Sequence, residues 1–320
     1  MRLPHICTLL ALAALAAPGA HAQSYPAKPI RLVVPFTPGG GVDINARLLA
    51  VKLTEYLNQQ VIVESRPGAG TNIGNEFVAK SAPDGYTLLI NSGAVAINMA
   101  LYRNLNYDSL RDLVPISLFS ESPNVLVVHP SLPVRSAKDL VALARTRPGR
   151  MNFSSSGSGT TQHLSGELFN LRTGVKLVHV PFRGTAPSLT AVVGGEVEIT
   201  FANIPAISSF VKAGRLRPLA TTGSKRAAQM ADVPTLKESG IDVEVTVRYG
   251  VFGPSAMPKD VVNTLAAAIA KAARSPDTRQ HLLDQGAEPV GNSPEEFAKI
   301  MKEEVVRWAE VVRISGARAD

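Results

Sequence analysis

The amino-acid sequence predicts an α/β fold, because short runs of β-branched residues alternate along the chain with longer segments of helical period. Gly, Pro, Ser or Asn marks each change between the two kinds of segment, as expected where strands and helices end. The chain has 320 residues, a length that favours two domains. Since no low-complexity linker separates two halves, we expect two lobes joined by more than one crossing of the chain.

The predicted strands and helices follow one another in regular order. Strands are expected at residues 30–36, 61–64, 86–91, 125–129, 151–154, 176–182, 197–203 and 216–221. Helices are expected between them at residues 43–57, 72–81, 137–147, 161–171, 187–193 and 205–213. This alternation predicts mostly parallel sheets that are covered by helices on both faces.

The C-terminal part of the chain is predicted to be helical. Helices are expected at residues 258–274 and 277–285, and a third begins after Ser293, where Ser-Pro-Glu-Glu forms a capping box with Pro at the first helical position. One face of this last helix carries the apolar residues Phe297, Ile300, Met301, Val305, Trp308 and Val312. The stripe predicts that the helix packs along a body already formed, with Trp308 as a core anchor.

Two extended segments are expected to cross between the lobes. Residues 124–130 follow a short strand at 115–119 almost directly, and the segment 243–254 is too long for one ordinary strand. We therefore place the first lobe at residues 23–122 plus 250–320 and the second lobe at residues 123–249. Apolar and polar residues alternate in the return crossing, which puts Arg248 on a polar face. That face is expected either to meet solvent or to floor the cleft between the lobes.

Residues 1–22 are interpreted as a secretory signal peptide. Arg2 and His5 precede an apolar stretch at residues 6–17, and Ala20-His21-Ala22 offers the small residues that a signal peptidase recognises. We expect cleavage near Ala22 and export of a soluble chain, since no later segment is apolar enough to span a bilayer. The only cysteine, Cys7, lies in this leader, which excludes disulfides and Cys-based sites from the mature chain.

The charge pattern argues against a nucleic-acid-binding protein. The chain carries a formal net charge of +7, but its basic residues are scattered, and Lys225-Arg226 is the only adjacent basic pair. Aromatic residues make up 5% of the chain, too few for the stacking platforms of single-stranded nucleic-acid binders. A diffuse positive field suits a small anionic partner.

Two Gly-rich loops are the strongest candidates for a binding site. Each joins a predicted strand to a predicted helix: VPFTPGGGVDINAR at residues 34–47 and NFSSSGSGTTQH at residues 152–163. In such a geometry free backbone N–H groups and the positive end of a helix face an anion. Because the loops fall in different lobes, we expect a ligand between the lobes, at the carboxyl ends of the strands. The alternative is that both loops are ordinary strand-to-helix turns.

Common enzyme motifs are absent from the sequence. The Gly-x-Gly-x-x-Gly fingerprint of dinucleotide-binding proteins is not completed in either loop. The chain has no Walker phosphate loop, no Gly-x-Ser-x-Gly elbow and no helical zinc-binding pair of histidines. The remaining catalytic candidate is Ser156 or Ser158 with His163 as base, a couple without an evident orienting acid.

The polar side chains of the loops have different expected roles. Asp43 lies in the first turn of the helix after GGG, where a free carboxylate would repel a bound anion, so we expect it to accept backbone N–H bonds and stiffen the loop. The hydroxyls of Thr37, Ser156, Thr160 and Thr161 can donate to a carboxylate. Local turn and cap bonding is their alternative role.

Many segments of the chain resemble the periplasmic solute-binding receptors of tripartite tricarboxylate transporters, the Bug or TctC-like family. The resemblance is carried in order by YPAKPIRLVVPFTPGGGVDINAR, VIVESRPGAGTNIG, AKSAPDGYTLLI, LYRNLNYDSLRDLVPI, NVLVVHPSLPVRSAKDL, SSSGSGTTQHLSGELF, HVPFRGTAPSLTAVVGGEVEITFAN, AGRLRPLATT and DVPTLKESG. So many motifs in one order are specific, whereas a single Gly-rich loop would not be. The resemblance implies the type II periplasmic binding protein fold, with two lobes joined by two crossing strands and the ligand cleft between them.

The resemblance also implies a set of ligand-binding residues. Backbone N–H groups, hydroxyls and ordered waters of the two loops are implied to hold one carboxylate, at Phe36, Thr37, Gly39, Gly40, Gly41, Ser155, Ser156, Gly157, Gly159 and Thr160. The second wall is implied to contain Phe182, Arg183, Gly184 and Asn203.

Two departures from the family's pattern leave the ligand unassigned. Arg248 stands where the family commonly has Trp, and Ala202 stands where an acidic residue often precedes Asn203. If Arg248 enters the cleft, we expect it to bind a second carboxylate of the ligand.

We therefore expect a receptor in the periplasm that captures a small organic carboxylate, such as a di- or tricarboxylate, and delivers it to the membrane subunits of a transporter. We expect a monomer that is not an enzyme and binds no cofactor, metal or nucleic acid. Two alternatives are an exported serine hydrolase that uses the serines of the second loop, and a receptor whose output is a sensor protein.

Overall fold

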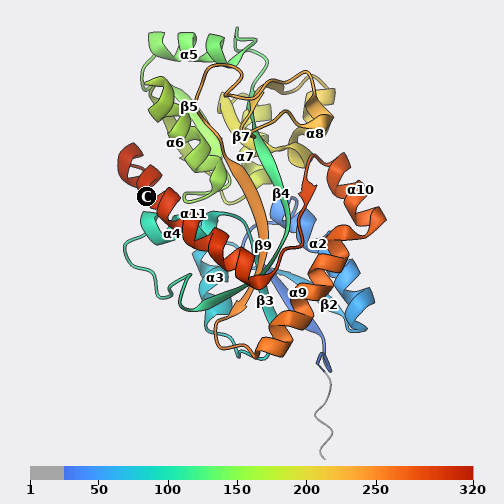
Figure 1. Cartoon of the computed structure of the whole chain (residues 1–320). Helices are drawn as coiled ribbons and strands as arrows, with labels where there is room; N and C mark the ends of the chain where they lie inside the picture. The colour runs from blue at the N-terminus through green and yellow to red at the C-terminus, as the bar shows by residue number, and fades with distance from the viewer. Residues whose placement is uncertain (1–24, 320) are drawn as a thin grey trace, which may run out of the picture.

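The computed structural model describes residues 25–319 and has two lobes, one above the other in Figure 1. The predicted leader, residues 1–22 with Cys7, lies outside the described residues. Two strands, β4 (Leu113–Val128) and β9 (Thr246–Pro254), run side by side through the middle of the molecule. The predicted α/β class is confirmed. Within residues 25–319, no helix is long and apolar enough to cross a membrane.

The lower lobe is built on a sheet with the strand order β2-β1-β3-β9-β4. Strand β1 runs parallel to β2 and β3, whereas β9 is antiparallel to both of its neighbours, and the short strand β10 pairs with β4. The elements of this lobe and of the C-terminal segment are β1 (Ile30–Val34), α2 (Gly41–Leu57), β2 (Val61–Ser65), the 3-10 turn η2 (Ala69–Thr71), α3 (Asn72–Ala79), β3 (Thr87–Asn91), α4 (Ala94–Leu101), α9 (Lys259–Arg274), α10 (Pro276–Asp284), β10 (Glu288–Pro289) and α11 (Pro294–Ser315).

The upper lobe is built on the sheet β4-β7-β5-β6, with β8 on the other edge of β4. Its elements are α5 (Ala137–Thr146), β5 (Met151–Ser155), α6 (Thr161–Thr173), β6 (Leu177–Pro181), α7 (Thr185–Val193), β7 (Ile199–Asn203), α8 (Ile204–Lys212), β8 (Arg217–Thr221) and the 3-10 turn η3 (Ala228–Met230). Strand β5 is parallel to β6 and β7, but β4 is antiparallel to β7 and β8. The prediction of parallel sheets therefore holds where a helix connects the strands and is wrong at the crossing strands, which run against their neighbours.

One prediction about a single element needs correction, one helix was missed, and the lobe boundaries remain open to test. The strands expected at 115–119 and 124–130 form one strand, β4, because the turn-like Ser-Glu-Ser-Pro stretch at 120–123 pairs with β9. Helix α4 was not predicted, since most of its residues are buried apolar ones and it shows no polar face. The lobe boundaries at 122/123 and 249/250 stay a prediction, because both strands run unbroken through these points.

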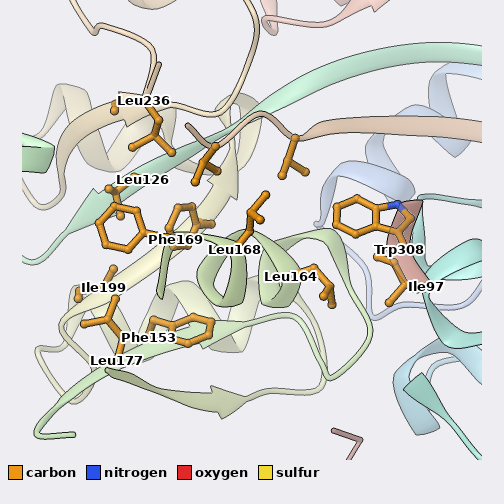
Figure 2. Packing of buried hydrophobic residues seen from close by; sticks show 14 of the residues in the cluster. Ile97, Leu126, Phe153, Leu164, Leu168, Phe169, Leu177, Ile199, Leu236 and Trp308 are labelled. Atoms are coloured by element: carbon orange, nitrogen blue, oxygen red, sulfur yellow. The ribbon is translucent and has the colours of Figure 1, made fainter. Parts of the chain in front are cut away.

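The C-terminal helix α11 lies across both lobes (Figure 1). It packs on α4 and β4 and also on α6 of the upper lobe. Trp308 is 0% exposed and belongs to one hydrophobic cluster with Ile97 of α4 and Leu164 of α6, as Figure 2 shows. The predicted role of Trp308 as a core anchor is confirmed, and the cluster around it joins the two lobes.

Arg248 connects the crossing strands to α11. Its Nη1 donates to Glu304 Oε1 at 2.8 Å, and its Nε lies 3.5 Å from Glu121 Oε2 on β4. Trp308 Nε1 donates to the other oxygen of Glu304 at 2.7 Å. The face of β9 that carries Arg248 thus packs against α11, and the apolar face of the strand points away from α11. Arg248 therefore lies outside the cleft in this structure, and the expectation that it joins the ligand-binding residues by holding a second carboxylate is not met.

Replacing Arg248 with Gln is expected to lower the free energy of unfolding by about 1 to 3 kcal/mol, because Glu304 would lose its hydrogen-bonded cation and keep only Arg307, whose Nη1 lies 3.8 Å from Glu304 Oε1. The Glu304 side chain is only 11% exposed. Denaturant titration of the full chain measures the change. Arg313→Gln is the matched control on α11, because Arg313 and Glu310 form an exposed pair whose loss costs about 0 to 1 kcal/mol. Equal small losses in both variants would contradict the connecting role of Arg248.

Candidate functional site

A small cavity between the lobes, which we call the inner cavity, lies where several helices begin. It is lined by Phe36, Gly40, Gly41, Val42, Ser92, Asn124, Ser156, Thr160, Thr161, Gln162, Thr185, Asn203, Val247 and Tyr249. These residues include positions at or just before the N-termini of α2, α4, α6, α7 and α8. First-turn N–H groups have no partner within their own helix, and the helix dipole is positive at this end. The cavity can therefore attract an anion, although none of its described lining residues is charged.

Two buried asparagines present oxygen atoms at this cavity. Asn124 and Asn203 lie opposite each other on β4 and β7 and are 1% and 5% exposed. The Nδ2 of Asn124 donates to Ser165 Oγ at 3.2 Å, and the Nδ2 of Asn203 donates to Tyr249 Oη at 3.1 Å. Neither Oδ1 has a hydrogen-bond partner among the described residues. A buried polar atom is costly unless it is satisfied, so both oxygens indicate a ligand or a water at this point.

Tyr249 keeps its phenol neutral at the floor of the inner cavity. Burial raises the pKa of its hydroxyl, while hydrogen bonds from Ser122 and Asn203 act in the opposite direction.

The cavity volume of about 20 Å³ has room for about one water. A Cβ atom on Gly41 would lie 2.6 Å from Tyr249 Oη and 2.0 Å from Asn203 Nδ2. Only glycine at position 41 therefore permits this close approach of the lobes.

The first loop, residues 36–41, is supported by Asp43. Its Oδ2 accepts the Gly39 N–H at 3.0 Å and lies 3.0 Å from Arg47 Nε. Asp43 is 3% exposed, and it does not line the inner cavity. Its Oδ2 is thus engaged by the loop backbone and by Arg47, whereas its Oδ1 has no hydrogen-bond partner among the described residues.

The second loop, residues 155–160, is held by hydrogen bonds of its own. Ser156 N–H donates to Gln162 Oε1 at 2.7 Å, and Thr160 Oγ1 donates to Gly157 O at 2.8 Å. Thr160 Oγ1 also accepts the His163 N–H at 3.3 Å, as an N-cap residue does. Gly159 has φ +83°, and a Cβ atom there would lie 2.0 Å from Asn98 Oδ1 of the lower lobe. The loop therefore fits against the lower lobe only through glycine at this position.

A larger hollow adjoins the inner cavity, and we call it the outer hollow. Its volume is about 590 Å³, and Phe36 and Ser156 line both spaces. The other lining residues are Pro35, Thr37, Pro67, Gly68, Ala69, Gly70, Thr71, Ile73, Gly157, Phe182 and Arg183. Most of these are apolar or glycine, and the exposed Arg183 is the one charged residue of the described set. The outer hollow can therefore receive an apolar chain that ends in a negative group.

The structure brings most of the predicted site residues together. Six of them line the inner cavity: Phe36, Gly40, Gly41, Ser156, Thr160 and Asn203. The outer hollow adds Thr37, Gly157, Phe182 and Arg183. Gly39, Ser155, Gly159 and Gly184 belong to the adjoining loops but line neither space, and Gly184 instead lies against Thr37 across the cleft. Arg248 lies apart from the whole group.

Several lining residues were missed by sequence reasoning. Ser92, before α4, was missed together with that helix, although Ser-Gly ahead of an apolar run is a helix start signal. Residues 66–71, Arg-Pro-Gly-Ala-Gly-Thr, carry a turn signal, and Ala69 and Thr71 have φ values of +46° and +84°. Asn124 and Tyr249 lie within strands, where no motif of the sequence marks them.

The structure does not form the Ser-His couple that was the catalytic alternative. His163 Nδ1 accepts the Gly159 N–H at 3.2 Å, so this ring nitrogen is not available as a base for Ser156 or Ser158. Ser155 does meet a histidine, with Oγ 2.6 Å from His179 Nε2, but Ser155 is 0% exposed. A buried hydroxyl cannot attack a substrate in the cleft.

Comparison with known proteins gives consistent matches. The family model described as "Tripartite tricarboxylate transporter family receptor" matches residues 45–316. Protein BugT of Bordetella pertussis is 38% identical over 97% of this chain and 95% of its own length. The solved structure titled R. palustris Rpa4515 with adipate has 38% identity and a TM-score of 0.89, covering 92% of this chain and 99% of that chain.

A second solved structure, MatC (Rpa3494) from Rhodopseudomonas palustris with bound malate, is 30% identical with a TM-score of 0.86, covering 90% of this chain and 100% of that chain. Each of these relatives matches 90% or more of this chain. The chain therefore belongs to the tripartite tricarboxylate transporter family receptors and has the two-lobed α/β fold of these binding proteins.

Proposed function

We propose that this protein is a periplasmic receptor that binds a small organic dicarboxylate between its two lobes and delivers it to the membrane subunits of a transporter. The observation that carries the proposal is the inner cavity, where five helix N-termini meet beside hydroxyl groups that can donate to an anion. Membership in the receptor family and relatives whose titles name adipate and malate support the same ligand class.

A carboxylate suits the inner cavity better than a neutral ligand. Six hydroxyl residues line it together with first-turn backbone: Ser92, Ser156, Thr160, Thr161, Thr185 and Tyr249. The Thr160 hydroxyl already donates to Gly157 O, so the donors come from the others. Hydroxyl and N–H groups are donors to an ionised oxygen, and such bonds are stronger than those to a neutral acceptor. The Oδ1 atoms of Asn124 and Asn203 accept hydrogen bonds, so they need a donor. A water, or a hydroxyl group of the ligand, can donate to them beside the carboxylate.

The second acidic group of the ligand is proposed to reach Arg183. The inner cavity, with a volume of about 20 Å³, has room for about one water in this structure, so it must widen to receive one carboxylate and leaves the rest of the acid outside. The remaining chain passes Phe36 and Ser156 into the outer hollow, where Phe182 and Ile73 offer apolar contact. An aliphatic dicarboxylate such as adipate has this order of groups.

Binding requires the lobes to separate and close. Tyr102 Oη donates to Ser158 O at 3.3 Å across the cleft, and Gly41 lies close to Asn203. A ligand cannot pass these contacts while they are made, so it enters when the lobes are apart. The closed form is then favoured because contacts from both lobes meet the ligand only there.

Adipate is expected to raise the melting temperature of the full chain, and Gly41→Ala is expected to abolish the effect. Ligand at about 100-fold excess over its dissociation constant stabilises the folded state by about 2.7 kcal/mol. The added Cβ would contact Asn203 and Tyr249 and keep the lobes from closing. Differential scanning fluorimetry measures both, with glucose and adipamide as neutral controls. Stabilisation by the neutral compounds alone would contradict carboxylate binding.

Arg183→Gln is expected to weaken adipate about 2- to 5-fold, the scale of an exposed ion pair, and to leave hexanoate nearly unchanged. Hexanoate has the same chain length but lacks the second carboxylate. Titration calorimetry gives the dissociation constants. Arg150→Gln is the matched control, because Arg150 is an exposed residue of the same lobe outside both spaces. Equal weakening of adipate and hexanoate would remove Arg183 from the site.

A further inference from the structure

A buried and a half-buried histidine lie stacked behind the second loop. The ring centroids of His163 on α6 and His179 on β6 are 3.8 Å apart, with 15° between the ring planes. Phe153 of β5 stacks on His179 at 5.0 Å, and His163 is 2% exposed. Neither imidazole lines the inner cavity or the outer hollow. The pair therefore lies one layer behind the proposed binding site.

Each ring contacts a different part of the second loop. His163 Nδ1 accepts the Gly159 N–H at 3.2 Å. His179 Nε2 lies 2.6 Å from Ser155 Oγ, which in turn accepts the Gly157 N–H at 3.1 Å. Two backbone N–H groups of the loop are thus tied to imidazole rings, one directly and one through Ser155.

These bonds hold the loop in a conformation that needs support. Gly157 and Gly159 have φ values of +137° and +83°. Ser156, between His179's partner Ser155 and Gly157, lines both the inner cavity and the outer hollow. Gly159 lies against Asn98 of the lower lobe. A change of the backbone at either glycine would therefore move Ser156 and alter the contact between the lobes.

We propose that His163 and His179 are positioning residues, which hold the second loop in the conformation that receives the ligand's carboxylate while both rings are neutral. This inference rests on the proposed function. His163 accepts the Gly159 N–H only while Nδ1 carries no proton, since a protonated Nδ1 would be a second donor facing that N–H. The bond therefore requires the neutral ring that carries its proton on Nε2.

The groups around the pair differ in charge. Glu167 Oε1 lies 3.7 Å from His163 Nε2. Burial first, and then the neighbouring His163, lowers the pKa of His179 from 6.5 to about 3. From the lower lobe, Asn98 and Tyr102 face the loop with uncharged groups at neutral pH. Because the pKa of His179 is depressed by folding, its contribution to stability is complete above about pH 6.5 and is lost as the pH falls toward 3.

Matched substitutions separate hydrogen bonding from packing. Asn at position 163 keeps an acceptor near the place of Nδ1, and Gln at position 179 keeps a polar atom near the place of Nε2, whereas Leu keeps neither. His163→Leu and His179→Leu are expected to weaken adipate about 10-fold or more, and His163→Asn and His179→Gln less than about 3-fold. Titration calorimetry on the full chain gives these values. His281→Leu, at an exposed position of α10, is expected to change nothing.

Two further measurements need no ligand. Amide hydrogen exchange at Gly157 and Gly159 is expected to accelerate in the Leu variants and to stay slow in His163→Asn and His179→Gln. Nitrogen-15 NMR of the unmodified protein at neutral pH is expected to show Nδ1 of His163 without a proton.

The outcomes distinguish this inference from the proposed function. Leu variants that bind adipate as tightly as the parent would overturn the positioning role. If the parent binds no carboxylate, the proposed function fails, and unchanged exchange at Gly157 and Gly159 in the Leu variants would then overturn the positioning role independently. If the Leu variants do not fold, the NMR measurement decides, because a proton on His163 Nδ1 at neutral pH is incompatible with the proposed bond.

Discussion

The pairing of β4 with β9 is the constraint on which the rest of the structure depends. The two strands are paired from Leu113 opposite Pro254 to Pro123 opposite Thr246, and β4 then continues between β7 and β8 of the upper sheet. Successive residues of a strand face opposite sides, so this pair of strands has one row toward the cleft and one toward α11. The same strands therefore join the lobes, floor the site and anchor the C-terminal helix.

The inner cavity shows how an anion can be attracted without a buried cation. An unpaired charge in a closed cavity is costly whenever the ligand is absent. Helix N-termini and hydroxyls provide donors at a smaller cost, because they carry only partial charges. Asp43 supports the first loop and is an acid. Its hydrogen bonds with Gly39 and Arg47 limit its repulsion of a bound carboxylate.

The site and the hydrophobic core share their helices. Ser92 before α4 and Thr161 of α6 line the inner cavity, and both helices pack on α11 around Trp308. A Cβ atom on Gly93 would lie 2.9 Å from Thr161 Cγ2, so the two helix ends meet closely. Movement of the lobes therefore changes the packing of α11 as well as the cavity. The packing of the core between the lobes thus contributes to the free-energy difference between the open and closed forms.

The sequence by itself determined the α/β class, the order of most elements, the two Gly-rich loops and the family resemblance. These features depend on local pattern: strand and helix periods, caps and turn residues act within a few positions of each other. The support of the first loop by Asp43 was foreseen for the same reason, since Gly39 and Asp43 are four residues apart.

Only the tertiary structure decided the rest of the site. It joined two expected strands into β4, and it brought Asn124, Thr185 and Tyr249 to the inner cavity from distant parts of the chain. It also paired Arg248 with Glu121 and Glu304, and it placed the apolar face of β9 at the cleft. Alternation along a strand defines two faces, but the choice between cleft and helix depends on which neighbour packs against each face, and that neighbour lies far away in the sequence.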